Sequence, residues 1–122
     1  MFKILIVEDD KELSQLFQKV LEKNGYQVKC ASDGMQALET LDTAYIDLII
    51  SDIMMPVMDG LTATKTIRSL KHPDAETIPI IAMTANAFRE DKEKCLAAGM
   101  NAHLAKPIKI ENIKRILYEY CV

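Results

Sequence analysis

Two kinds of segment alternate along this chain, and the alternation limits the folds open to it more than any other feature. Short apolar runs alternate with longer segments whose apolar residues recur at helical spacing, and there are five of each. Such alternation is typical of parallel βαβ units. Strands are predicted at residues 3–7, 27–31, 47–51, 78–84 and 102–105, and helices at residues 11–24, 34–41, 61–70, 87–98 and 109–120. The sequence therefore predicts an α/β fold with a five-stranded parallel sheet and five helices.

The composition of the apolar runs indicates where each strand lies in the sheet. Three runs contain almost no polar residue and read ILIV, LII and IPIIAM. Strands that helices cover on both faces have this composition. The run at residues 27–31 instead alternates Val28 and Cys30 with Gln27 and Lys29, which predicts an edge strand.

The segment at residues 11–24 carries the clearest helical pattern. Its apolar residues, spaced for one face of a helix, are Leu13, Leu16, Phe17, Val20 and Leu21. Asp10 is a suitable N-cap for this helix. Gly25 and Gly99 stand where two of the helices are expected to end.

Length and composition bound the class of protein. A chain of 122 residues, 49% hydrophobic and 27% charged, corresponds to one soluble globular domain. A net charge of -3 gives no general affinity for nucleic acid or for an anionic membrane. The three widely spaced cysteines fit neither a disulfide framework nor a CxxC site, which favours a cytoplasmic location. No stretch approaches the ~20 apolar residues of a membrane span, and the first apolar run is too short for a signal peptide.

Residues that can carry chemistry stand at the ends of four predicted strands. They are Glu8, Asp9 and Asp10 after the first, Asp52 after the third, Thr84 at the end of the fourth and Lys106 after the fifth. Ligands of open parallel sheets gather outside the carboxyl ends of the strands, so these side chains are expected to converge. Converging carboxylates favour a hard divalent cation such as Mg²⁺. Lys106 and Thr84 suit the oxygens of a phosphoryl group, which Asp52 can accept as a nucleophile.

Each of these residues also has a purely local interpretation. The acidic run at residues 8–10 can cap a helix, Asp52 can belong to a turn, Thr84 can cap the next helix and Lys106 can be a surface lysine. Taken singly, the local interpretation is the better one for most of them. Complementary chemistry at four separate strand ends favours the combined site.

The sequence resembles the receiver domain of two-component response regulators over essentially its whole length, residues 1–122. The resemblance rests on ILIVEDD, DLIISDIMMPVMDG, IPIIAMTANA and AAGMNAHLAKPI. Four such motifs in this order and strand context are specific, although each alone is weak. The resemblance implies a doubly wound, flavodoxin-like fold with strand order 2-1-3-4-5.

The resemblance implies a metal site and a phosphoacceptor. Asp52 matches the aspartate that accepts the phosphoryl group, and Glu8 and Asp9 match the acidic pair that holds Mg²⁺. Asp9 is expected to bind the metal directly and Glu8 mainly through water. Asp52 and the backbone carbonyl of Met54 are expected to be further ligands.

The resemblance also implies residues that sense the phosphoryl group. Thr84 matches the switch hydroxyl, and Lys106 matches the lysine that pairs with the phosphoryl group, with a cis bond to Pro107. His103 stands where the family commonly has Tyr or Phe. Two interpretations of His103 remain open: a switch residue, or a partly exposed histidine with no switching role.

The implied function is a phosphorylation-controlled switch rather than an enzyme with turnover, with at most self-phosphorylation and slow autodephosphorylation. Its expected cofactor is Mg²⁺, and its expected donor is a sensor histidine kinase or a histidine phosphotransfer protein. Output is expected through a protein such as an effector, through phosphotransfer to another histidine, or through a domain absent from this chain, without direct contact to nucleic acid or membrane. The run AMTANA resembles receivers of hybrid histidine kinases and phosphorelays.

Other function classes fit the sequence less well. A flavin-binding domain has the same topology, but the acidic run at residues 8–10 would repel a phosphate after the first strand. An aspartyl-phosphate phosphatase has a second Asp two residues after its nucleophile, where this chain has Met54. The chain has neither a GxGxxG motif for a dinucleotide nor a basic helix for DNA.

Overall fold

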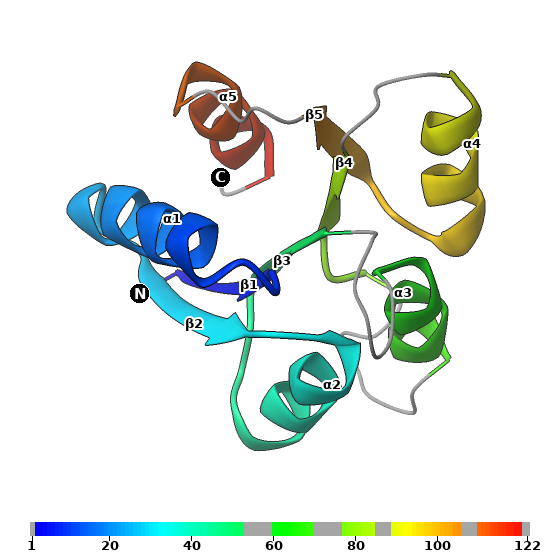
Figure 1. Cartoon of the computed structure of the whole chain (residues 1–122), viewed down its shortest axis with the longest axis horizontal. Helices are drawn as coiled ribbons and strands as arrows, with labels where there is room; N and C mark the ends of the chain where they lie inside the picture. Colours follow the sequence, from blue (N-terminus) through cyan, green and yellow to red (C-terminus); the bar gives the residue numbers. More distant parts are fainter. Residues whose placement is uncertain (1, 53–59, 70–76, 85–88, 106–109, 121–122) are drawn as a thin grey trace.

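A computed structural model describes residues 2–52, 60–69, 77–84, 89–105 and 110–120 of the chain. In these residues strands and helices alternate as predicted (Figure 1). The strands are β1 (Lys3–Val7), β2 (Gln27–Ala31), β3 (Leu48–Asp52), β4 (Ile80–Thr84) and β5 (Ala102–Ala105). The helices are α1 (Lys11–Lys23), α2 (Gly34–Thr43), α3 (Gly60–Arg68), α4 (Arg89–Ala98) and α5 (Ile110–Tyr120).

The five strands form one parallel sheet in the order β2-β1-β3-β4-β5. This order confirms the predicted topology, and β2 lies at an edge as its alternating composition predicted. The central strands β1 and β3 are almost wholly buried.

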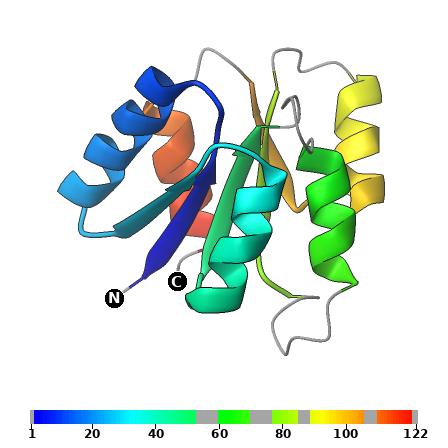
Figure 2. The same cartoon turned by 60° about the horizontal axis from the view of Figure 1, so that its bottom comes forward.

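Helices cover both faces of the sheet (Figures 1 and 2). Successive strand residues point to opposite faces, so the central strands β1, β3 and β4 contribute to two separate cores. Ile4 and Ile6 pack in the core that includes Phe17 of α1 and residues of α5. Leu5 belongs to the other core, with residues of α2, α3 and α4. The apolar strands are therefore buried because both of their faces are covered.

Strand β3 differs from its prediction by one residue at each end. It begins at Leu48 rather than at residue 47 and includes Asp52, which pairs with Met83 of β4. Asp47 lies before the strand, where its backbone N–H donates to the Lys3 carbonyl and its carboxylate accepts from the Lys3 N–H at 2.7 Å. The prediction that Asp52 follows the strand was wrong, because the ladder with β4 continues through it.

Strand β4 begins at Ile80, two residues later than predicted. Pro79 precedes it and has no N–H to donate to a ladder, although its carbonyl accepts from the Ile49 N–H at 2.9 Å. The described helix ends lie within two residues of their predictions. No helix in the described ranges is long and apolar enough to span a membrane.

The predicted signals at helix ends are confirmed. Asp10 is the N-cap of α1, where its side chain accepts from the backbone N–H groups of Glu12 and Leu13 at 3.0 and 3.3 Å. Gly25 and Gly99 follow α1 and α4 with φ of 91° and 106°. These are backbone conformations that disfavour side chains with a Cβ.

The two glycines differ in their surroundings, which gives a matched pair of substitutions. A Cβ at Gly25 meets no atom within 4 Å, whereas a Cβ at Gly99 lies 3.0 Å from Cγ of Arg68. Arg68 also donates from Nε and Nη2 to the Gly99 carbonyl at 3.0 and 2.7 Å. Gly25→Ala is expected to lower the free energy of unfolding by about 1 kcal/mol through backbone strain. Gly99→Ala is expected to lower the free energy of unfolding by about 1 kcal/mol more than Gly25→Ala does, because Arg68 must shift from its hydrogen bonds.

Urea denaturation of both variants measures this difference in the free energy of unfolding. Equal losses in the two variants would contradict the proposed crowding by Arg68.

Candidate functional site

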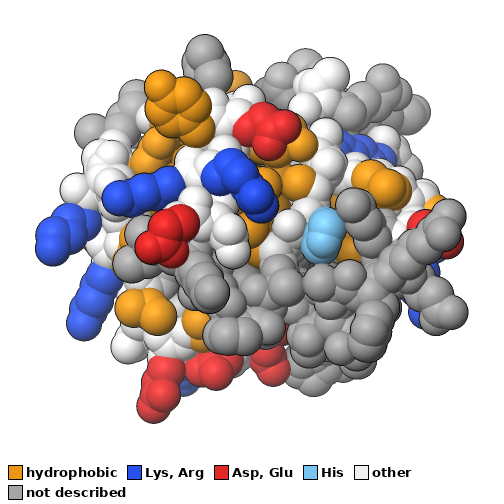
Figure 3. Space-filling view, turned by 90° about the horizontal axis from the view of Figure 1, so that it is seen from above, with side chains coloured by type: hydrophobic (Ala, Val, Ile, Leu, Met, Phe, Trp, Pro, Cys, Tyr) orange, Lys and Arg blue, Asp and Glu red, His pale blue; other side chains and the backbone are white. Residues whose placement is uncertain are grey.

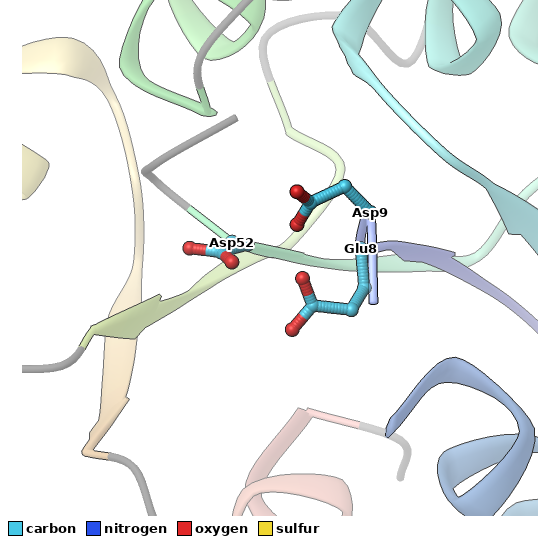
Figure 4. A group of neighbouring side chains, drawn as sticks. All are labelled: Glu8, Asp9 and Asp52. Atoms are coloured by element: carbon cyan, nitrogen blue, oxygen red, sulfur yellow. The ribbon is translucent and has the colours of Figure 1, made fainter. Parts of the chain in front are cut away.

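Three acidic side chains meet at the carboxyl edge of the sheet. Glu8 and Asp9 follow β1, and Asp52 is the last residue of β3. One carboxylate oxygen of each residue lies within 4.8 Å of those of the other two. Figure 4 shows the three carboxyl groups gathered around a common space.

The register of the central strands produces this convergence. β1 and β3 are neighbours, and Val7 pairs with Ser51. Glu8 and Asp52, the next residues, therefore lie side by side at the carboxyl ends of the two strands. The Glu8 N–H donates to the Ala31 carbonyl of β2 at 3.0 Å, which keeps the backbone in the sheet for one residue beyond β1. Residues 44 positions apart in sequence are thereby held side by side.

The three carboxylates differ in exposure. Glu8 and Asp52 are buried, with 2% and 6% of their surface exposed, whereas Asp9 is exposed. Buried carboxylates this close repel one another unless a cation or a proton compensates them. Clustered carboxylate oxygens are the donors that Mg²⁺ prefers. The donor set fits a hard divalent cation, and the exposure of Asp9 leaves the cluster open to solvent on one side.

Asp10 does not belong to this cluster although it directly follows Asp9. Its carboxylate accepts from the backbone N–H groups at the start of α1. The acidic run thus divides into two residues at the cluster and one helix cap. Since Ser also caps helices well, the cap is separable from the cluster by mutation.

The ends of β4 and β5 reach the same edge of the sheet. Met83 pairs with Asp52, and Thr84 pairs with Ala105 at the end of β5. Of the predicted site residues, Thr84 is described only by its backbone, and Met54, Lys106 and Pro107 lie outside the described residues. His103 lies within β5, pairs with Ala82 and is half-buried.

One buried polar group beside the cluster, Ser51, was not among the predicted site residues. Ser51, with 3% of its surface exposed, donates from its hydroxyl to the Asp52 carbonyl at 3.1 Å. This bond helps to fix the backbone that carries the Asp52 side chain. In the sequence, Ser51 is the single polar residue at the end of an apolar run, directly before Asp52, and this position could have pointed to it.

Comparison with known proteins gives consistent similarities. The family described as response regulator receiver domain matches residues 4–118. Sensor histidine kinase RcsC of Escherichia coli strain K12 is 42% identical over 117 residues, which cover 96% of this chain and 12% of that protein. The chain therefore corresponds in length to a small part of RcsC.

Two solved structures are similar along the whole chain. The receiver domain of sensor histidine kinase PA1611 from Pseudomonas aeruginosa, described with a magnesium ion coordinated in its active site cleft, is 40% identical with a TM-score of 0.88. The match covers 98% of this chain and 96% of that one. The receiver domain of Saccharomyces cerevisiae Ssk1, in complex with the phosphotransfer protein Ypd1, is 27% identical with a TM-score of 0.88, over 98% and 88% of the two chains.

Proposed function

This chain belongs to the response regulator receiver domain family of two-component phosphorelays, and from that premise we propose that Asp52 accepts a phosphoryl group from a phosphohistidine. The observation that carries the proposal is the gathering of Glu8, Asp9 and Asp52 within 4.8 Å at the end of the central strands. We propose further that residues 1–122 form one receiver domain. A receiver domain is a signalling switch, and its only turnover here would be self-phosphorylation and slow autodephosphorylation.

The proposed reaction is the transfer of a phosphoryl group from nitrogen to oxygen. A carboxylate oxygen of Asp52 attacks phosphorus, and the O–P bond forms as the P–N bond of phosphohistidine breaks. The electron pair of the P–N bond stays on the imidazole nitrogen. Catalysis of such transfers consists mainly of positioning and charge neutralisation. Pairing of β3 with β4 and the Ser51 hydroxyl hold the Asp52 backbone in place for the attack.

We propose that Glu8, Asp9, Asp52 and the backbone carbonyl of Met54 hold Mg²⁺, with Asp9 bound directly and Glu8 mainly through water. When bound, Mg²⁺ neutralises the carboxylates and the negative charge of the phosphoryl oxygens. The clustered carboxylates and the magnesium ion of the similar PA1611 receiver support this proposal.

The remaining site residues are proposed to sense the phosphoryl group. The Thr84 hydroxyl would turn toward it, and the Lys106 ammonium would pair with it. The end of β4 at Thr84, level with the end of β5, supports this placement. His103 is a candidate switch residue, since it lies half-buried in β5 three residues before Lys106.

The proposed donor is a sensor histidine kinase or a histidine phosphotransfer protein. The complex of the similar Ssk1 receiver with Ypd1 supports a histidine phosphotransfer protein as the donor. An effector protein is a further proposed partner. The net charge of -3 supports the proposal that the chain contacts neither nucleic acid nor a membrane directly, and we propose a cytoplasmic location.

Phosphoramidate tests the proposed function, because it carries the same type of P–N bond as phosphohistidine and needs no cognate kinase. Incubation with phosphoramidate and Mg²⁺ is expected to add the mass of one phosphoryl group to the intact chain. The matched control replaces Mg²⁺ with EDTA and is expected to leave the mass unchanged. An unmodified chain in the presence of Mg²⁺, or equal modification in EDTA, would contradict the proposal.

A further inference from the structure

The turn between α4 and β5 ends in a polar residue, Asn101, that binds the start of the neighbouring strand. The backbone N–H of Asn101 donates to the Ile80 carbonyl at 2.8 Å. Its side-chain Oδ1 accepts from the Ile80 N–H at 2.9 Å. Asn101 directly precedes β5, and Ile80 is the first residue of β4. Both backbone polar groups at the start of β4 are therefore bound by one residue, at the amino edge of the sheet and opposite the acidic cluster.

Arg68, the last residue of α3, holds Asn101 from a second side. Its Nη2 donates to Oδ1 of Asn101 at 2.9 Å, and its Nε and Nη2 donate to the Gly99 carbonyl at 3.0 and 2.7 Å. Helices α3 and α4 lie side by side (Figures 1 and 2), so the guanidinium bridges their ends. Burial lowers the pKa of Arg68, which shows that this group is partly withdrawn from water. Hydrogen bonds are stronger in such surroundings than in water.

Helix α5 holds Asn101 from a third side. The Tyr120 hydroxyl, in the last residue of α5, donates to the Asn101 carbonyl at 3.3 Å. The backbone N–H, the backbone carbonyl and Oδ1 of Asn101 are thus all bonded, each to a different part of the chain. We call Arg68, Ile80, Asn101 and Tyr120 the amino-edge clamp. The clamp joins α3, β4 and α5 at the residue from which β5 starts.

Strand β5 itself has few side chains that fix its position along β4. It is four residues long and lies at the edge of the sheet. Its one large apolar side chain is Leu104, which packs in the core shared by α1 and α5. His103 is half-buried: Figure 3 shows a histidine at the surface, and His103 is the only histidine among the described residues. Register is set by the side-chain pattern, and this pattern is weak in β5. The register therefore depends on contacts before the strand, from the buried Met100 and from the clamp.

The register of β5 matters most at the opposite end of the strand. Thr84 pairs with Ala105, and Met83 pairs with Asp52, so β5 ends at the edge that carries the acidic cluster. Lys106 follows Ala105 in the sequence. A slip of two residues is the smallest that keeps each side chain on its face, and it moves the strand by about 7 Å. An ion pair requires its two atoms to lie within about 4 Å, so such a slip would separate Lys106 from a phosphoryl group on Asp52.

We propose that Asn101, held by Arg68, is a positioning residue that fixes the register of β5 on β4 and so brings Lys106 level with Asp52. Asn101 acts from the far end of the strand and touches no reacting atom. The inference rests on the proposed pairing of Lys106 with the phosphoryl group. Its first test therefore uses the unphosphorylated chain, in which the register can be probed without any phosphoryl transfer.

Amide hydrogen exchange, followed by NMR, provides this first test. Asn101→Ala removes Oδ1, whereas Asn101→Asp keeps an oxygen that accepts from Ile80 and Arg68. Position 101 is exposed, so neither change disturbs a core. Asn101→Ala is expected to speed exchange at least about tenfold along β5 up to Leu104, and to leave β1 and β2 within about twofold. Asn101→Asp is expected to stay within about threefold of the wild type throughout. Unchanged exchange in β5 of Asn101→Ala, or equal acceleration in β1 and β2, would overturn the proposal.

The rate of phosphorylation by phosphoramidate provides the second test. Asn101→Ala is expected to react about tenfold more slowly at saturating Mg²⁺, because a displaced Lys106 no longer neutralises the phosphoryl oxygens. Its affinity for Mg²⁺ is expected to be unchanged, since Glu8, Asp9 and Asp52 belong to β1, β3 and their ends. Asn101→Asp is expected to restore the rate. A parallel loss of Mg²⁺ affinity, which general destabilisation would cause, or no recovery in Asn101→Asp would overturn the proposal.

Asn24→Ala is the matched control for the loss of an exposed asparagine. The Asn24 side chain donates to the Val20 carbonyl at 2.7 Å at the end of α1, far from β5 in the sheet order. This variant is expected to react at the wild-type rate and to keep the exchange of β5. Slowing equal to that of Asn101→Ala would overturn the proposal. Failure of the wild-type chain to gain phosphoryl mass would contradict the proposed function instead, and hydrogen exchange would still decide the role of Asn101.

Discussion

Asp52→Asn is expected to abolish phosphorylation of the chain by acetyl phosphate in the presence of Mg²⁺. The side-chain amide has nearly the same shape as the carboxylate, but it is neutral and is a far weaker nucleophile. We expect the rate to fall below about one thousandth of the wild-type rate, which removes the gain of one phosphoryl mass from the intact protein. The fold should persist, because the backbone pairing of Asp52 with Met83 does not involve the side chain.

Asp33→Asn is the matched control for this substitution. Asp33 caps α2 by accepting from the Gln36 N–H at 2.9 Å, and Asn caps helices as well as Asp does. This variant should be phosphorylated at the wild-type rate. If Asp52→Asn still gained the mass of one phosphoryl group, another residue would be the acceptor.

Asp9→Asn is expected to abolish Mg²⁺-dependent phosphorylation by weakening binding of the metal. Asp9 is the exposed member of the cluster, and the loss of its charge removes one anionic oxygen ligand. We expect the affinity for Mg²⁺ to fall about 100-fold, measured by isothermal titration calorimetry. Phosphorylation at low Mg²⁺ concentration should fall in parallel.

Asp10→Ser is the neighbouring control and should keep both Mg²⁺ affinity and phosphorylation. The Asp10 carboxylate bonds to the backbone of α1, and a serine hydroxyl can replace it there. The reverse result, with loss in Asp10→Ser and retention in Asp9→Asn, would show that the wrong acidic pair was assigned to the metal.

Most of the fold follows from local patterns in the sequence. Buried strands read as nearly continuous apolar runs, and β2 reads as an edge strand because only one of its faces is apolar. The strand ends were less predictable. Strand β3 was predicted to end at residue 51, directly before Asp52, but its ladder with β4 continues through Asp52. Pro79 delays the start of β4 in a way that the apolar run alone does not reveal.

The gathering of Glu8, Asp9 and Asp52 could be predicted because parallel strands bring their carboxyl ends to one edge. Their different environments could not be predicted from the sequence. Burial of Glu8 and exposure of Asp9 depend on the direction of each side chain at the end of β1. The hydrogen bond from Ser51 depends on a rotamer within the core.

The surroundings of helix α5 were also only partly predictable. Helical spacing identifies Tyr118 as an outward residue, since Ile113, Ile116 and Leu117 fall on the opposite side. A groove beside Tyr118 exists only because α1 packs next to α5. Tertiary packing of this kind cannot be read from the pattern of one helix.

The most direct measurement of the central claim is chemical mapping of the phosphorylated residue. Borohydride reduces an aspartyl phosphate to homoserine, which marks the acceptor permanently. Trypsin then separates the peptide of residues 30–65, which contains Asp52, from that of residues 4–11, which contains Glu8, Asp9 and Asp10. We predict homoserine at position 52 after treatment with acetyl phosphate and Mg²⁺. Homoserine at another aspartate of either peptide, or none in a chain that has gained phosphoryl mass, would contradict the assignment of Asp52 as the phosphoacceptor.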